Sequence, residues 1–509
     1  MRPVVAPRIP LYLLANAGFA LLVGVGYAIG GGPNPRLLYV ITLFALCSSF
    51  IIDLDGLNGR YAMLAFFMLV YFVTFGVGDL GNLFTGGESP AAMPASHGLD
   101  GAEAVILVGG FMLVLGYRAA VRLVSAGYPV QRALDWPKPT ILIVGLIFWV
   151  IGTIATYRWY VYVIPDTTDE AFRKGLSSIG PAMVIAYLLG QMLQPLGTLL
   201  LAYAWTVFRN SYSMVLIIAV VTTQLFIGFV SDSKGLAMIG IILVIMTSTL
   251  IRGRIPKGWV AVGLVFVTLV YPYFTAYRAA VHGAGIARTS VVENFAAILQ
   301  KTANAKDKIN TGKNRAQTFL ERSNVKGNVE VIVAKAGNGV AFQYGHTLSP
   351  ILEAFIPKIA LSSKVTIPTG QLFNKQFHLV EGDEVYISPS HLGELYWNFG
   401  WAGVVIGMGI IGLLCGWVSA RFNLGDVRTV TRVLVILITV KQLIVSFEST
   451  VSDCYVVWLR ALAAIGILHI VFARARVIPR ASESTIHGPK EVAANDRPSS
   501  GRLFPNLLT

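Results

Sequence analysis

Apolar stretches of about 17–25 residues recur along the chain, and each is long enough to cross a hydrocarbon layer of about 30 Å as an α-helix. Because lipid offers the backbone no hydrogen-bond partners, only helices and closed barrels span a bilayer. The sequence therefore predicts an all-α polytopic membrane protein with about twelve transmembrane helices. The predicted spans are 11–31, 37–52, 61–78, 103–124, 139–160, 181–207, 212–230, 235–251, 258–277, 393–420, 429–447 and 454–473.

Composition and charge agree with a membrane protein. Of the 509 residues, 55% are hydrophobic and 13% are charged, whereas soluble domains carry about 25% charged residues. The net charge of +14 could suggest nucleic-acid binding. Basic residues near the ends of spans instead orient a membrane protein, so we expect no nucleic-acid partner.

The distribution of Lys and Arg predicts the topology. With twelve spans and a cytoplasmic N-terminus, all the basic clusters fall on the cytoplasmic side, as the positive-inside rule requires. The connection 78–101 holds no Lys or Arg and falls outside, which in a bacterium is the periplasmic face of the inner membrane. The clusters are Arg118 to Lys138, Arg252 to Lys257, Arg421 to Arg432 and Arg474 to Arg480.

A long polar segment separates the ninth predicted span from the tenth and falls on the periplasmic side. Loops held by a rigid scaffold are where function concentrates, so the site is expected there. The chain divides into an N-terminal bundle of about nine spans (1–277), a large, partly helical periplasmic loop (278–392), three C-terminal spans (393–476) and a disordered cytoplasmic tail (477–509).

Positive charges near the outer ends of spans are candidates for a binding site, because a charge beside hydrocarbon is costly. At Lys234, which begins a span, free N–H groups and the helix dipole favour an anion such as phosphate or pyrophosphate. An interfacial anchor that pairs with Asp232 is the alternative. The candidates are Arg158, Lys234, Arg278, Lys441 and Arg460.

Two pairs of opposite charges stand seven residues apart, Lys441 with Glu448 and Asp453 with Arg460. This spacing places both members of a pair on one face of a helix. Buried compensating pairs are the simplest interpretation, whereas a cation left unpaired would become a ligand site.

His391 and Glu394 stand three residues apart at the start of the tenth predicted span. A general base with an orienting partner fits this spacing. The spacing also suits zinc, although no third ligand is fixed nearby. In the plainest alternative, Glu394 caps the helix and His391 is a surface residue. The chain contains no phosphate-binding P-loop and no nucleophile motif of the GxSxG type.

The tenth span is rich in glycine. Small residues three or four apart allow neighbouring helices to approach closely. Tight packing within one protomer is the main expectation, and a dimer seam is the alternative. The glycines are Gly400, Gly403, Gly407, Gly409, Gly412 and Gly416.

Five short motifs, spread over the roughly sixty residues 344–403, resemble the O-antigen polymerase, or oligosaccharide repeat-unit polymerase (Wzy-like), family. Departures from the family pattern are Lys358 where Arg is common, Val365 where Pro is common, and the absence of Trp-Pro around 360–362. The segment 231–235 also looks like the start of an earlier span in that family. The motifs are YGHT at 344–347, IPK at 356–358, Lys364, GQLF at 370–373 and PSHLGELYWNFGWAG at 389–403.

The resemblance implies an inverting, metal-independent glycosyl transfer without a cofactor, in which lipid pyrophosphate is the leaving group. Glu394 and His391 are the expected catalytic residues. The expected pyrophosphate ligands are Arg278, Lys234, Lys358 and Lys364, with Arg158 and Arg288 in reserve. The aromatic rings expected to contact sugars are those of Tyr386, Tyr396 and Trp397.

The implied partners are an undecaprenyl-pyrophosphate-linked oligosaccharide, membrane lipid and a chain-length regulator protein. The implied product is a surface polysaccharide such as O-antigen, capsule or exopolysaccharide. Two alternatives remain open. One is an O-antigen-ligase type of glycan transfer, and the other is a transporter, or flippase, of lipid-linked sugar.

Overall fold

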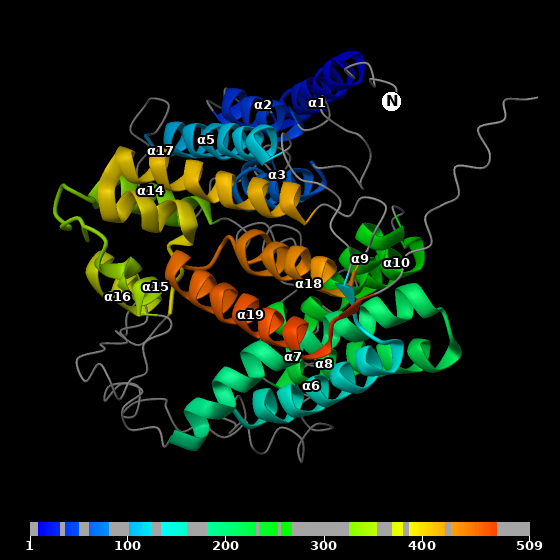
Figure 1. The fold of residues 1–509 in the computed structure, drawn as a ribbon. Helices are drawn as coiled ribbons and strands as arrows, with labels where there is room; N and C mark the ends of the chain where they lie inside the picture. The colour runs from blue at the N-terminus through cyan, green and yellow to red at the C-terminus, as the bar shows by residue number, and fades with distance from the viewer. Residues whose placement is uncertain are drawn as a thin grey trace, which may run out of the picture.

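The computed structural model is almost wholly helical (Figure 1). Within the ranges described, the only strands are β1 (Leu134–Asp135) and β2 (Arg474–Ala475), which pair in antiparallel fashion. The residues described are 9–30, 36–49, 61–80, 101–124, 134–159, 181–230, 234–252, 256–266, 325–353, 369–379, 386–422 and 429–475.

Every predicted span contains a helix. The helices are α1 (Ile9–Gly30), α2 (Arg36–Cys47), α3 (Ala62–Phe75), α5 (Gly101–Val124), α6 (Lys138–Arg158), α7 (Pro181–Phe208), α8 (Ser211–Val230), α9 (Lys234–Arg252), α10 (Lys257–Val265), α14 (Lys326–Lys335), α15 (Ser349–Leu352), α16 (Thr369–Phe377), α17 (Ser390–Arg421), α18 (Val430–Thr439) and α19 (Val451–Phe472). A 3-10 turn, η7 (His346–Leu348), precedes α15, and a π-helical turn, η8 (Val440–Val445), continues α18.

Among the described helices, five are long and apolar enough to cross a membrane: α5, α6, α8, α17 and α19. The protein is therefore an all-α protein of the membrane class, as predicted. The number of twelve spans and the side of the membrane on which the long loop lies stay predictions.

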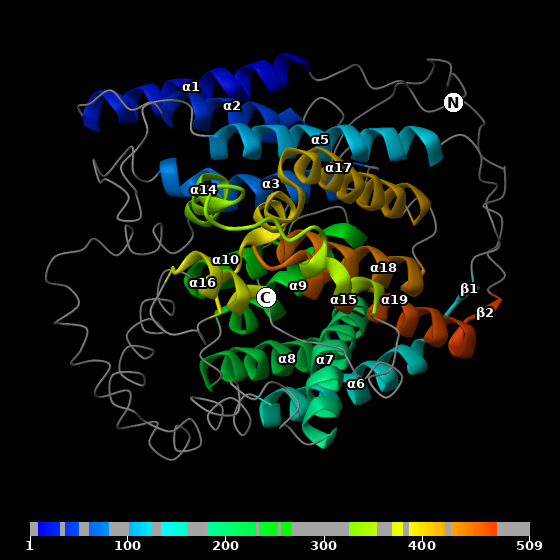
Figure 2. The same cartoon turned by 90° about the vertical axis from the view of Figure 1, so that its left-hand side faces the viewer.

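The helices form two groups with α18 and α19 between them (Figures 1 and 2). In one group α5 lies along α17 beside α1, α2 and α3. In the other group α6 lies along α7, next to α8, α9 and α10. Since α18 and α19 contact both α17 and α7, they join the two groups.

Glycines allow α5 and α17 to pack backbone to backbone. A Cβ atom added to Gly116 would lie 2.2 Å from the carbonyl oxygen of Gly409, and one added to Gly412 would lie 2.2 Å from that of Leu113. Only glycine fits such an approach. The expectation of tight packing within one protomer is thus confirmed for Gly412 and also for Gly416, whose Cβ would lie 2.4 Å from Tyr117 O.

We expect Gly412→Ala to lower the free energy of unfolding by about 1–3 kcal/mol, because the added methyl group overpacks this contact. Gly409→Ala is the matched control on the same helix. Its Cβ would meet only the Met112 side chain, at 3.8 Å, so stability should stay unchanged or rise by up to about 1 kcal/mol through helix propensity. Unfolding by SDS in mixed micelles measures both variants, and equal losses would contradict the packing described here.

The described part of the predicted loop folds onto the helix ends. Helix α14 packs on α5 and α17 and buries Val329 and Ile332. The Asn328 side chain donates to the Ser388 carbonyl oxygen at 2.8 Å. This part of the loop is therefore continuous with the helical core.

Candidate functional site

Helix α17 is broken at Gly400, where φ is 59° and ψ is −141°. Glycine adopts this left-handed conformation without the steric cost that a side chain imposes. The break separates a short half-helix, Ser390–Phe399, from the apolar half, Trp401–Arg421. The two halves meet closely, because a Cβ on Gly403 would lie 2.1 Å from the Leu395 carbonyl oxygen.

The segment 341–348 caps the broken end. The backbone N–H of Gln343 donates to Trp397 O at 3.0 Å, and that of Tyr344 donates to Asn398 O at 3.1 Å. The Asn398 side chain accepts from Gly345 N at 2.8 Å and donates to Thr347 Oγ1 at 2.7 Å. Carbonyl groups freed by a helix break require such partners, above all at membrane depth. Residues of the YWNFG motif thus build the break and its cap.

His391 lies on the half-helix and is fully buried. Its Nδ1 atom is 2.9 Å from Phe447 O and 3.0 Å from Ser449 O. Carbonyl oxygens only accept hydrogen bonds, so Nδ1 carries the hydrogen. The ring stacks on Phe447 with centroids 5.0 Å apart. Nε2 has no hydrogen-bond partner among the described residues, and in the neutral ring this atom carries the free lone pair.

Glu394 is also fully buried and faces the same turn. Its Oε2 atom accepts a hydrogen bond of 2.5 Å from the Val451 N–H, the first residue of α19. A carboxylate is stabilised there by the free N–H groups and the dipole of the helix. Its Oε1 atom is buried and has no hydrogen-bond partner among the described residues. Glu394 therefore caps α19 rather than its own helix, and His391 is a core residue rather than a surface one.

Two more charged groups lie close to this turn. The Asp453 carboxylate accepts from Tyr386 Oη at 3.0 Å and from Thr450 Oγ1 at 2.7 Å. Within the described part of the chain the Lys441 side chain makes no hydrogen bond or ion pair, so the predicted pair with Glu448 is not formed. The Lys441 carbonyl oxygen accepts from the Ser446 N–H at 3.2 Å and from Ser446 Oγ at 3.1 Å. Lys441 is thus joined to the start of the turn that holds His391.

The three aromatic candidates have different surroundings. Tyr386 is 47% exposed, so its ring is accessible. Tyr396 is 9% exposed, which leaves little of its ring for a ligand. Trp397 is 0% exposed, because it packs against Phe373 and Phe377 with ring centroids 5.8 and 5.3 Å away. The expected contact between Trp397 and a sugar does not fit this position, and Trp397 is a core residue.

The structure brings few of the predicted cations to the buried pair. Arg158 is exposed at the end of α6, and no hydrogen bond or ion pair among the described residues joins it to His391 or Glu394. Lys234 is the first residue of α9, as predicted. The remaining expected pyrophosphate ligands lie outside the described residues: Arg278, Arg288, Lys358 and Lys364.

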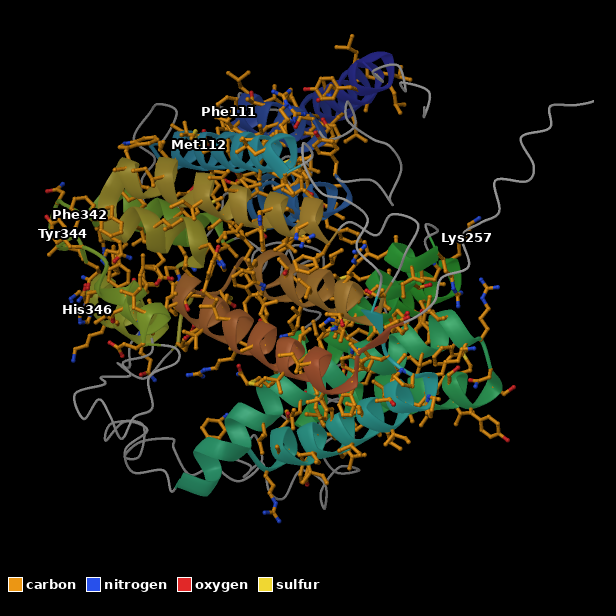
Figure 3. The ribbon with its side chains drawn as sticks, in the orientation of Figure 1. Phe111, Met112, Lys257, Phe342, Tyr344 and His346 are labelled. Carbon is orange, nitrogen blue, oxygen red and sulfur yellow. The ribbon has the colours of Figure 1, made fainter. Side chains whose placement is uncertain are left out.

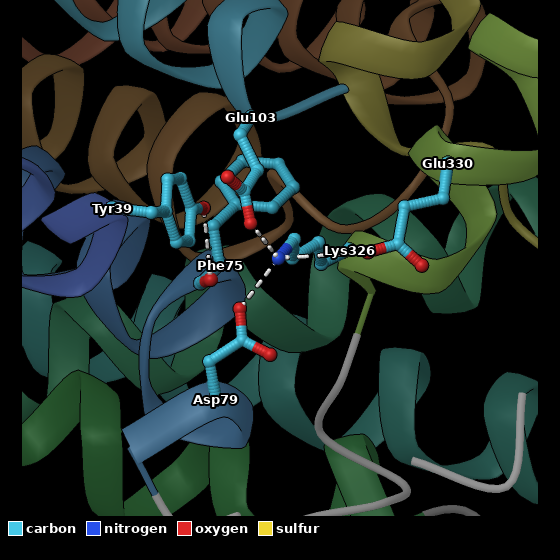
Figure 4. Close-up of polar contacts among 6 residues, drawn as sticks. All are labelled: Tyr39, Phe75, Asp79, Glu103, Lys326 and Glu330. Carbon is cyan, nitrogen blue, oxygen red and sulfur yellow. Dashed lines mark hydrogen bonds and ion pairs between the residues drawn. The ribbon is translucent and has the colours of Figure 1, made fainter. Parts of the chain in front are cut away.

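A buried ion cluster at Lys326 was not predicted (Figure 4). Lys326 Nζ lies 2.6 Å from Asp79 Oδ2 and 2.8 Å from Glu103 Oε1, and 4.4 Å from the centre of the Tyr39 ring. Burial opposes the charged amine, but the two carboxylates outweigh burial and raise the pKa of Lys326. Asp79 and Glu103 stand at the two ends of the connection 78–101, which contains no Lys or Arg. Two acidic residues without a basic neighbour were the feature of the sequence that could have indicated this cluster.

The Lys326 cluster positions the site. It fastens the start of α14 to α5 and to the short helical segment 77–80 that follows α3. Helix α14 in turn packs on the half-helix of α17, where Ile332 Cδ1 would lie 2.7 Å from a Cβ on Gly393. The buried pair therefore depends on a chain of contacts that begins at Lys326.

Fold and site together define an all-α protein of the membrane class with a broken helix that carries a buried His–Glu pair. No known family, curated protein or solved structure matches this chain. Among the described residues, no third His, Cys, Asp or Glu joins the pair in a metal-ligand cluster.

Proposed function

We propose that the protein is a glycosyltransferase that polymerises oligosaccharide repeat units linked to undecaprenyl pyrophosphate. The single observation that supports this most is His391, whose Nδ1–H is held by two backbone carbonyls while Nε2 is unpartnered. This imidazole lies within the motif that resembles the repeat-unit polymerases. The amine of Lys441, which has no partner among the described residues, adds a cation on the residue that is bonded to the start of the same turn.

In the proposed reaction, a hydroxyl group of one lipid-linked unit attacks the anomeric carbon of a second lipid-linked chain. A new C–O bond forms, the bond from that carbon to the pyrophosphate breaks, and the configuration inverts. The pyrophosphate leaves with the electron pair, and the hydroxyl proton passes to His391 Nε2. Cations offset the growing charge on the leaving group. Lys441, one of the candidate cations of the sequence, is added here to the expected pyrophosphate ligands.

Glu394 has a positioning role in this proposal. By accepting the Val451 N–H it holds the start of α19 against the half-helix, and so it fixes the turn whose carbonyls orient His391. Since His391 has no exposed surface, a substrate reaches Nε2 only when the groups that cover this atom move aside, while the turn 446–450 keeps its hold on Nδ1. We assign the contact with a sugar to Tyr386, whose ring is accessible and whose hydroxyl donates to Asp453 beside this turn.

Deletion of the gene in its own host tests the proposal. We expect only single repeat units on lipid, because no long chain can form without the transfer step. Long chains that stay on lipid pyrophosphate would indicate a ligase instead. Unpolymerised units confined to the cytoplasmic leaflet would indicate a transporter. Gel electrophoresis of glycan released by mild acid, with a complemented strain as control, separates single units from long chains. Labelling of intact spheroplasts with a membrane-impermeant reagent shows in which leaflet the single units lie.

A further inference from the structure

The depth of α17 in a bilayer follows from its packing on α5. The two helices run in the same direction, because Gly116 lies beside Gly409 and Gly416 lies beside Ala120. The apolar half of α17, Trp401–Arg421, has about 21 residues and rises about 31 Å, close to the thickness of a hydrocarbon core. The stretch of α5 from Ala102 to Arg122 has the same number of residues, so it rises by the same length.

Both helices carry an arginine at one end of this length. Arg122 and Arg421 mark one membrane surface, where a cation reaches water. The apolar half of α17 begins at Trp401, directly after the break at Gly400. Since this half is about as long as the hydrocarbon core is thick, the break lies near the opposite membrane surface.

The capping segment is held at this membrane surface. Its Tyr344 N–H donates to Asn398 O at 3.1 Å, and a Cβ on Gly345 would lie 3.2 Å from the Phe399 ring. Asn398 and Phe399, which the segment contacts, both lie within two residues of the break. The Tyr344 side chain is nevertheless 78% exposed, so its ring projects from the protein at the depth of the membrane surface.

Aromatic rings gather around this point. Phe342 lies 6.3 Å from Tyr344 and 6.5 Å from Tyr396, and Tyr396 lies 6.2 Å from Trp401, between ring centroids. Phe399 and Trp401 are each 45% exposed. We call the five residues Phe342, Tyr344, Tyr396, Phe399 and Trp401 the aromatic cluster. Figure 3 shows Phe342 and Tyr344 at one end of the molecule and Lys257 at the opposite end.

The surface next to the aromatic cluster is apolar. Ile406, Ile410 and Leu413 are exposed along the apolar half of α17, which is a candidate membrane span. Tyrosine and tryptophan concentrate where hydrocarbon meets headgroups, because their rings are apolar and their edges are polar. The aromatic cluster therefore continues a lipid-facing surface into the headgroup layer.

We propose that the aromatic cluster is a membrane anchor, with Tyr344 inserted between phospholipid headgroups. The partner is the bilayer surface itself. The anchor holds the segment 341–348, and through it the break in α17, at a constant depth. The half-helix with His391 and Glu394 then lies just beyond the hydrocarbon layer. The anchor requires only that α17 spans the bilayer, so it stands or fails separately from the proposed reaction.

Spin labels on single cysteines test the anchor in vesicles of phosphatidylcholine and phosphatidylglycerol. Tyr344→Cys is compared with Ile410→Cys, a reference for hydrocarbon, and with Lys375→Cys, a reference for water. Lys375 is exposed on α16, which packs on the half-helix beyond the break. The native Cys47, Cys415 and Cys454 are buried and are replaced by alanine in all three variants.

Collision rates with oxygen and with a water-soluble nickel chelate report depth. We expect the nickel collision rate at position 344 to be several-fold lower than at 375 and several-fold higher than at 410. A rate at 344 equal to that at either reference would overturn the anchor. Because Tyr344 is exposed, its replacement should leave the fold intact, and an unchanged unfolding transition in mixed micelles verifies this.

Discussion

The variant His391→Asn is expected to lose nearly all polymer formation, with a transfer rate lower by about 10²–10⁴-fold, the usual contribution of a general base. Asparagine places an amide N–H where Nδ1 stands, so donation to Phe447 O and Ser449 O can persist. It has no atom that replaces Nε2. The variant thus removes the proton acceptor while it keeps the contact that holds the turn.

The distribution of chain lengths in a complemented deletion strain measures this effect, with the protein amount in membranes checked by immunoblot. Glu394→Gln is the matched control, because the amide oxygen can still accept the Val451 N–H. If Glu394 acts only by holding α19, this variant keeps most of the activity, whereas Glu394→Ala loses it. Full activity of His391→Asn would exclude His391 as the base. If Glu394→Gln were inactive, the general base would be Glu394 and not His391.

The second large effect is expected at the buried ion cluster. Lys326→Met should lower the free energy of unfolding by about 3–5 kcal/mol, the usual result when one partner of a buried ion pair is removed. Methionine has a similar volume, but it leaves the carboxylates of Asp79 and Glu103 buried without their cation. Each of the three side chains is at most 5% exposed, so water cannot replace the lysine.

Glu330→Gln is the control within the same cluster. Glu330 lies 3.5 Å from Lys326 Nζ, and its side chain is 26% exposed, so the loss should stay below about 1 kcal/mol. Neutralising both carboxylates as Asp79→Asn and Glu103→Gln in the Lys326→Met background should recover part of the stability. SDS titration in mixed micelles measures all of these variants. A loss in Lys326→Met no larger than in Glu330→Gln would contradict the role given to the cluster.

Part of the candidate site could be predicted from local sequence. His391 and Glu394 stand three residues apart on one helix, and this spacing already suggested that they act together. Trp397 was misjudged because an aromatic residue in a motif can either face a ligand or fill the core. Which of the two occurs depends on α16, whose phenylalanines cover Trp397 and whose position no local pattern reveals.

The all-α class and the presence of a helix in every predicted span could be predicted from the amino-acid sequence. This was possible because backbone groups in lipid must bond within their own segment, which makes hydropathy a local signal. By contrast, the folded arrangement was needed to show that Lys326 meets Asp79, 247 positions away, and that His391 meets a turn more than fifty residues distant. These contacts result from the packing of whole helices, and no single segment encodes where its neighbours come to lie.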